Sequence, residues 1–181
     1  MPANRKIIFL LGGARSGKST FAQELAEQLG SKVLFIATGE ALDDEMQTRI
    51  KEHKKGRPKN WRTLETPRNV GKTLKEHIGN SEVVIIDCLT LLVSNLLADE
   101  LDYPEAEKRV MAEINELITT MDAIRANFII VSNEVGLGLV PDNKLGRIYR
   151  DLLGKANQLI AKRANQVYFL AAGIPLKLKD D

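Results

Sequence analysis

The chain has 181 residues, of which 44% are hydrophobic and 28% are charged, a composition typical of one globular domain with its own core. The formal charge is +2, from 26 Lys and Arg against 24 Asp and Glu, too small an excess to favour a protein that coats nucleic acid. We therefore expect one domain over residues 1–181 and no nucleic-acid partner.

A single cysteine, Cys88, excludes an intramolecular disulfide and a multi-cysteine zinc site and favours a reducing compartment. The apolar run at residues 7–11 is far shorter than the roughly 20 residues needed to cross a bilayer, and no signal-peptide cleavage pattern follows it. We expect a cytoplasmic protein without a membrane span.

Five short apolar runs rich in β-branched and aromatic residues predict buried strands, at residues 6–11, 33–37, 83–87, 128–132 and 167–171. The clearest helices are predicted at 18–29, 104–124 and 144–163. The second of these has Pro104 in its first turn and one apolar stripe, made of Val110, Ile114, Leu117, Met121 and Ile124. Gly30 is expected to end the first helix. Strands alternating with helices predict an α/β fold with a mostly parallel sheet covered on both faces.

A phosphate-binding loop is predicted where the first strand meets the first helix. The sequence there satisfies G-x-x-x-x-G-K-[ST], with Gly12, Gly13, Ala14, Arg15, Ser16, Gly17, Lys18 and Ser19. Its backbone N–H groups would face phosphate oxygens, Lys18 would reach the β- and γ-phosphates, and Ser19 would ligate Mg²⁺. A glycine-rich turn that binds nothing would not require Lys-Ser at the start of the helix.

Asp87 ends the third predicted strand and is our candidate for the second metal-positioning carboxylate, expected near Ser19. The alternative is a strand-end Asp that caps the next helix. Cys88 follows it and is interpreted as a small buried residue rather than a nucleophile, because the sequence offers no activating partner.

A basic segment, residues 49–62, contains seven Lys and Arg and one Glu, so it carries +6 and leaves −4 for the rest. A solvated charged face is the usual interpretation of such a run. Here Gly56-Arg57-Pro58 would break a helix, and His53 lies among cations that would lower its pKa from about 6.5 and leave a neutral, nucleophilic imidazole. Residues 39–67 are the least regular stretch, and we expect them to move. His77 is interpreted as a solvated helix residue.

These segments together resemble the bifunctional adenosylcobinamide kinase / adenosylcobinamide-phosphate guanylyltransferases of cobalamin biosynthesis. The resemblance spans nearly the whole chain, and its most specific parts are the histidine segment and the Asn133–Gly136 run. The shared segments are residues 12–19, 35–38, 42–46, 49–50, 53–58, 61–63, 87–90, 133–136 and 140–141.

The resemblance implies a P-loop NTPase-type, RecA-like fold and two reactions at one nucleotide site. In the first, ATP or GTP phosphorylates the aminopropanol hydroxyl of adenosylcobinamide, a corrinoid. In the second, GTP reacts with a histidine to give histidyl-GMP and pyrophosphate, and adenosylcobinamide phosphate then takes the GMP to give adenosylcobinamide-GDP. The resemblance also implies a homo-oligomer, specifically a homotrimer.

His53 occupies the family's histidine position, preceded by Glu52 where some members carry a second histidine. Lys18 is the other predicted catalytic residue, and Ser19 and Asp87 are the predicted Mg²⁺ ligands. Beyond the phosphate loop, the resemblance implies contacts to GTP from Ala37, Thr38, Gly39, Lys54, Lys55, Gly56, Arg57, Glu65 and Asp87. Taken singly, Thr38-Gly39 could be only a strand-end turn and Glu65 only a surface acid.

Three other functions stay open at this point. A P-loop small-molecule kinase without guanylyltransferase activity would transfer only the γ-phosphoryl group. A non-enzymatic GTP-binding switch is less favoured because the guanine-reading run Asn-Lys-x-Asp is missing from the sequence. A nucleic-acid-stimulated ATPase would use the basic segment, which has no interleaved aromatic residue except Trp61.

Overall fold

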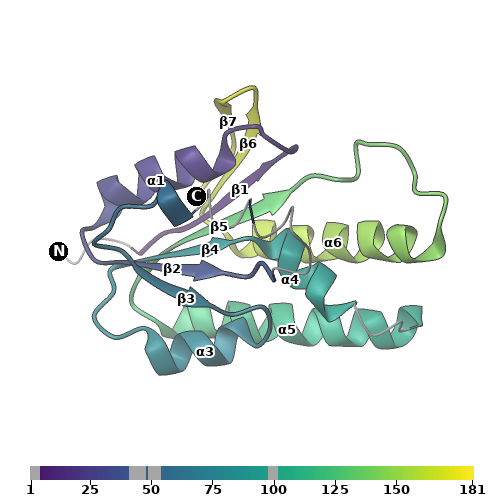
Figure 1. Cartoon of the computed structure of the whole chain (residues 1–181), viewed down its shortest axis with the longest axis horizontal. Coiled ribbons are helices and arrows are strands. Elements are labelled where there is room, and N and C mark those ends of the chain that lie inside the picture. Colours follow the sequence, from purple (N-terminus) through teal and green to yellow (C-terminus); the bar gives the residue numbers. More distant parts are fainter. Residues whose placement is uncertain (1–4, 41–47, 49–53, 98–101) are drawn as a thin grey trace.

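The computed structural model describes residues 5–40, 48, 54–97 and 102–181. Its centre is a seven-stranded sheet in the order β3-β2-β4-β5-β1-β6-β7 (Figure 1). The strands are β1 (Ile7–Gly12), β2 (Val33–Ala37), β3 (Arg62–Glu65), β4 (Val83–Asp87), β5 (Asn127–Asn133), β6 (Gln166–Ala171) and β7 (Ile174–Asp180). Neighbouring strands are parallel except β7, which is antiparallel to β6. The predicted α/β class with a mostly parallel sheet is confirmed.

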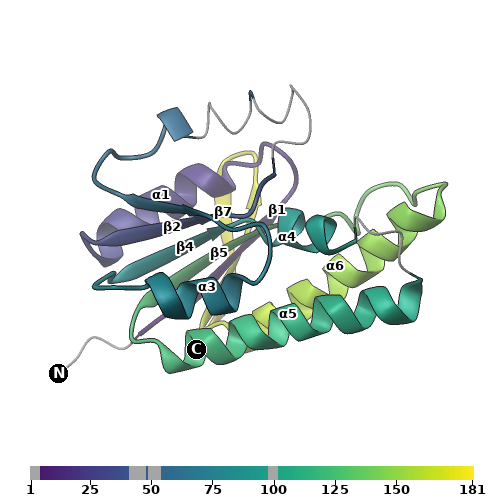
Figure 2. The same cartoon turned by 60° about the horizontal axis from the view of Figure 1, so that its bottom comes forward.

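Helices cover both faces of this sheet. They are α1 (Lys18–Leu29), α3 (Val70–His77), α4 (Leu89–Leu96), α5 (Tyr103–Ala123) and α6 (Lys144–Arg163). Figures 1 and 2 show α1 on one side of the sheet and α3, α5 and α6 on the other. We call these sides the α1 face and the α5 face.

Alternation along the buried strands divides their side chains between the two faces. The α1 face carries Ile8, Leu10, Val33, Phe35, Val83, Ile85, Ile129 and Val131, which pack with Ala22 and Ala26 of α1. The α5 face carries Ile7, Phe9, Leu34, Ile36, Val84, Ile86, Phe128 and Ile130. The predicted stripe of α5 packs on the second face, where Val110, Ile114, Leu117 and Met121 are fully buried.

All five predicted strands and all three predicted helices are present, with α1 and α6 at the predicted bounds. Gly30 caps α1, and Pro104 lies in the first turn of α5. The prediction of an irregular stretch over 39–67 was wrong at its end, because β3 pairs with β2 there. We did not predict α3, α4 or β7. His77 is exposed in the last turn of α3, as predicted.

Within the described residues, no helix is both long enough and apolar enough to pass through a membrane.

Candidate nucleotide-binding site

The phosphate loop lies between β1 and α1, at the carboxyl end of the sheet. A Cβ added to Gly12 would lie 2.4 Å from the Leu170 carbonyl oxygen and 2.6 Å from Ser16 Oγ. Gly17 has a φ of 91°, and its added Cβ would lie 3.0 Å from Gly173 Cα. Both positions therefore require glycine. The amide of Gly173, in the β6–β7 turn, donates to the Ser16 carbonyl at 3.0 Å, so this turn braces the loop.

Lys18 begins α1 and lies folded over the loop. Its Nζ donates to the Gly13 carbonyl at 2.5 Å and to Ser16 Oγ at 3.3 Å. The side chain is buried, and burial lowers the pKa of its ammonium. These contacts place the ammonium within the loop, where its charge would act on a bound phosphate.

Asp87 is the last residue of β4. In the sheet, β5 lies between β4 and β1, the strand that leads into the phosphate loop. Ser19 Oγ donates to Asp87 Oδ2 at 3.3 Å, so the predicted proximity of these two residues is confirmed. The capping alternative was wrong, because α4 begins at Leu89 after an N-cap at Cys88.

The Ser19 hydroxyl and the Asp87 carboxylate fit a Mg²⁺ ion. Both are oxygen ligands, which this hard cation prefers. Mg²⁺ usually takes one or two protein ligands and completes its shell with phosphate and water oxygens, so two such residues would suffice to hold it.

Cys88 is partly buried behind Asp87. Burial, and secondly the neighbouring Asp87 charge, raise the pKa of its thiol to about 12. The thiol is therefore protonated at neutral pH, which agrees with its interpretation as a packing residue.

Thr38 and Asn95 support the backbone around Asp87. The fully buried Thr38 hydroxyl donates to the Cys88 carbonyl at 2.6 Å and accepts from the Cys88 amide at 2.8 Å. Asn95 Nδ2 donates to the carbonyls of Thr38 at 2.7 Å and Pro67 at 3.0 Å. Sequence reasoning missed Asn95, although a lone amide in the apolar run of α4 is a signal, because a buried amide needs hydrogen-bond partners.

In the described part of the basic segment, Arg57 and Trp61 pack on the α1 face. Lys54 and Lys55 are exposed and helical, and the helix ends before Gly56 as predicted. Lys54 Nζ pairs with Glu65 Oε1, at the end of β3. The Arg57 guanidinium lies over the Phe35 ring, 3.7 Å from its centroid, and Trp61 is buried nearby. A solvated face is therefore wrong for Arg57.

Other predicted residues meet at the same edge. Ala37 pairs with Asp87 on one side and with Glu65 on the other, and Gly39 is partly buried just beyond it. The Glu134 amide donates to the Gly12 carbonyl at 3.1 Å, which places the Asn133–Gly136 run beside the phosphate loop. His53 and residues 42–46 and 49–50 lie outside the described residues.

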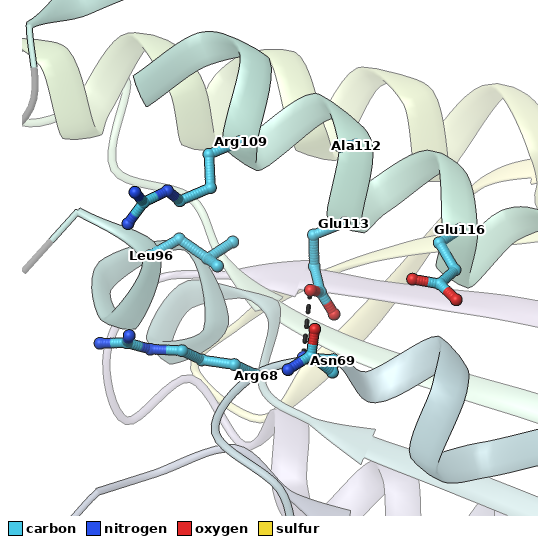
Figure 3. A pocket seen from close by; sticks show the side chains of 7 residues that line it. All are labelled: Arg68, Asn69, Leu96, Arg109, Ala112, Glu113 and Glu116. Carbon is cyan, nitrogen blue, oxygen red and sulfur yellow. Dashed lines mark hydrogen bonds between the residues drawn. The ribbon is translucent and has the colours of Figure 1, made fainter. Parts of the chain in front are cut away.

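A cavity of about 320 Å³ lies elsewhere, on the α5 face between α3, α4 and α5 (Figure 3). Its charged groups largely balance one another. Glu113 accepts from the amides of Asn69 and Val70 at the start of α3, and Glu116 pairs with Lys75 at 3.8 Å. Arg68 and Arg109 extend toward the same side of the cavity. None of the predicted nucleotide contacts lines it.

Comparisons with known proteins identify the family of the chain. Residues 8–178 match the family model described as cobinamide kinase / cobinamide phosphate guanyltransferase. The bifunctional adenosylcobalamin biosynthesis proteins CobU of Escherichia coli and Salmonella typhimurium are 42% and 39% identical, each over 96% of this chain and 99% of the relative. CobP of Pseudomonas aeruginosa is 43% identical over 95% of this chain and 96% of its own.

The fold resembles that of the RadB recombinase, with a TM-score of 0.52 and 17% identity over 91% of this chain and 73% of that one. This likeness supports the predicted P-loop NTPase-type, RecA-like fold. The family match and the three relatives cover nearly all of the sequence, including the phosphate loop and Asp87. The chain therefore belongs to the cobinamide kinase / cobinamide phosphate guanyltransferase family, whose bifunctional members serve adenosylcobalamin biosynthesis.

Proposed function

We propose that this chain performs both reactions of its family at one triphosphate site, formed by the phosphate loop, Asp87 and the basic segment. The observation that carries the proposal is the contact between Ser19 and Asp87. Next to Ser19, the ammonium of Lys18 donates to the Gly13 carbonyl within the phosphate loop. A hydroxyl, a carboxylate and an ammonium held this close provide the groups that phosphoryl transfer requires.

In the kinase step, the γ-phosphoryl group of ATP or GTP passes to the aminopropanol hydroxyl of adenosylcobinamide. The N–H groups of the phosphate loop and the Lys18 ammonium hold the phosphate oxygens and stabilise their developing charge. Ser19 and Asp87 would hold Mg²⁺, which when bound neutralises charge on the phosphates. Thr38 and Asn95 keep the Asp87 backbone in place through their hydrogen bonds.

In the second step, His53 attacks the α-phosphorus of GTP. A nitrogen–phosphorus bond forms as the bond between the α-phosphorus and the bridging oxygen breaks, and pyrophosphate leaves with that electron pair. A phosphate oxygen of adenosylcobinamide phosphate then attacks the same phosphorus, and the electron pair of the nitrogen–phosphorus bond returns to the imidazole. The products are adenosylcobinamide-GDP and the unmodified side chain of His53.

The contacts implied for Ala37, Thr38, Gly39, Lys54, Lys55, Gly56, Arg57 and Glu65 belong to this proposal. For Ala37, Thr38, Gly39 and Glu65 the support is positional, because β2 and β3 end side by side at the carboxyl edge, where ligands of α/β sheets bind. For the segment 54–57 the support is the pairing of Lys54 with Glu65 and the stacking of Arg57 on Phe35. The side chain of Thr38 is buried and engaged with Cys88. Its amide donates to the Asp87 carbonyl at 3.1 Å and its carbonyl accepts from Asn95, so Thr38 acts in this proposal by holding the backbone at the carboxyl edge.

Transfer of label from α-labelled GTP tests the histidine. We expect acid-labile, base-stable label on the wild-type protein and on His77→Ala, and none on His53→Ala. His77→Ala is a matched control because His77 is the second of the two histidines in the chain and is exposed on α3. Undiminished label on His53→Ala would overturn the assignment.

Transfer of label from γ-labelled nucleotide to adenosylcobinamide separates the two reactions. We expect His53→Ala to retain this transfer while forming no adenosylcobinamide-GDP. Equal loss of both reactions would mean that His53 has a structural role. A wild-type protein that transfers only γ-label would be the simpler P-loop kinase.

We also propose a homotrimer in the cytoplasm, where nucleoside triphosphates and reduced thiols are available. Support for self-association comes from β7, an edge strand on which Ile174, Leu176 and Leu178 are exposed. Apolar side chains in a row on a sheet edge favour contact with another protein surface.

A further inference from the structure

The Arg57 side chain combines two features that are seldom found together. Its guanidinium carbon lies 3.7 Å from the centroid of the Phe35 ring. Its Nε and Nη1 atoms are buried and have no hydrogen-bond partner in the part of the chain that the structure describes. A buried N–H group without a partner costs free energy, so these two donors are groups that the oxygens of a ligand could satisfy.

The position of Phe35 fits a phosphate ligand. Phe35 lies on the α1 face, the same face as the helix that the phosphate loop begins. It is two residues before Ala37, which pairs with Asp87 and Glu65 at the carboxyl edge. Burial lowers the pKa of the Arg57 guanidinium, and the charges of Asp87 and Glu65 oppose this effect. The Arg57 cation is thus within electrostatic range of the metal-binding carboxylate.

We propose that Phe35 is a positioning residue, whose ring holds the Arg57 guanidinium where it meets the oxygens of the bound triphosphate. This rests on the proposed function, in which Arg57 contacts the nucleotide. A planar guanidinium can stack on an aromatic ring with its face while its edge donates hydrogen bonds. The stack restricts the Arg57 side chain before the nucleotide arrives, so less conformational entropy is lost on binding.

The strand that carries Phe35 reads Val-Leu-Phe-Ile-Ala and is buried along its whole length. Leucine at position 35 would satisfy the hydrophobic requirement, but it would offer no π face to a cation. The substitution Phe35→Leu therefore removes the stacking surface and keeps an apolar side chain.

A double-mutant cycle tests the proposal, with kcat/KM for GMP transfer from GTP as the readout. The four proteins are the wild type, Phe35→Leu, Arg57→Ala and the double variant. We expect Phe35→Leu to lower kcat/KM by about 10- to 30-fold in the wild-type background. In the Arg57→Ala background the same change should have less than about a twofold effect, because the group that the ring positions is gone.

Three further variants separate positioning from packing. Phe35→Tyr keeps the ring and should restore most of the activity. Phe128→Leu removes a fully buried ring on the α5 face, and Arg68→Ala removes an arginine beside the α3–α5 cavity; both should leave kcat/KM near the wild-type value. If Phe35→Leu does not fold, as judged by thermal unfolding, Phe35→Met takes its place in the cycle.

Two outcomes would overturn the proposal, and only the second would also contradict part of the proposed function. Equal losses from Phe35→Leu in both backgrounds would make Phe35 a packing residue and leave the proposed function intact. An Arg57→Ala variant with wild-type kcat/KM would remove Arg57 from the proposed nucleotide site and Phe35 with it. Label transfer to His53 would then still test the histidine independently.

Discussion

The two faces of the sheet are covered differently in the described part of the chain. On the α5 face, α3, α4, α5 and α6 bury a continuous apolar cluster that includes most of the large hydrophobic side chains. On the α1 face, α1 packs on the middle strands, and the Arg57–Trp61 part of the basic segment covers Phe35. The heavily covered face supplies most of the buried apolar area, and the other face carries α1 with the phosphate loop at its start.

The residues that stabilise the fold and the residues of the candidate site lie largely in different parts of the molecule. Burial of apolar area is the main favourable term in folding, so the α5 face carries most of the stability. The polar groups of the candidate site lie at the carboxyl edge or over the α1 face, where they disturb the larger cluster least. Changes on the two faces should therefore have different consequences.

The largest expected loss of activity follows from Lys18→Ala. Removing an ammonium that stabilises charge on the transferring phosphate should lower kcat of both reactions by roughly 10²- to 10³-fold or more. The matched control is Lys72→Ala, an exposed lysine of α3 on the α5 face, which should retain wild-type rates. Steady-state rates of both reactions measure this, and retention of either reaction by Lys18→Ala would contradict the shared site.

The opposite pattern is expected from Leu117→Ala on α5. Leu117 is fully buried, and truncation of a buried leucine costs about 2–5 kcal/mol of the free energy of unfolding. Urea unfolding measures that cost. At a temperature where the variant is folded, its kcat should stay close to the wild-type value. A large fall in kcat without a loss of stability would show that the two faces are not separate in function.

The last prediction concerns the reactivity of the Cys88 thiol, which follows Asp87 in the sequence. A thiol pKa of about 12, against the usual 9.0, leaves roughly a thousandth of the usual thiolate at pH 8. Alkylation by iodoacetamide should therefore be slow in the folded protein at pH 8, faster as the pH rises toward 12, and fast in urea. Rapid alkylation of the folded protein at pH 8 would contradict the protonated, packed thiol.

The sequence sufficed for the elements whose pattern reflects burial alone. Continuous apolar runs identified the five inner strands, and the stripe of α5 identified that helix. β3 was missed because Arg62–Glu65 is polar, as an edge strand can be, and its pairing with β2 depends on contacts distant in sequence. α4 was missed because it is short and mostly apolar, and periodicity alone cannot distinguish such a run from a buried strand.

The parts of the candidate site whose residues are close together in the sequence were predictable. The phosphate loop is a contiguous motif, and Asp87 follows a strand directly. The stack of Arg57 on Phe35 and the bridge from Asn95 to Thr38 join residues that only the folded sheet brings together. No periodicity in the sequence encodes such contacts, and physical reasoning finds them only when the topology is known.

The brace between the β6–β7 turn and the phosphate loop has a consequence for folding. The Gly173 amide donates to the Ser16 carbonyl, and these two residues are distant in the sequence. Because contacts between distant parts of a chain form late, the loop should acquire its final shape only when the β6–β7 hairpin docks. Nucleotide affinity would thus depend on a hairpin that contributes none of the predicted nucleotide contacts.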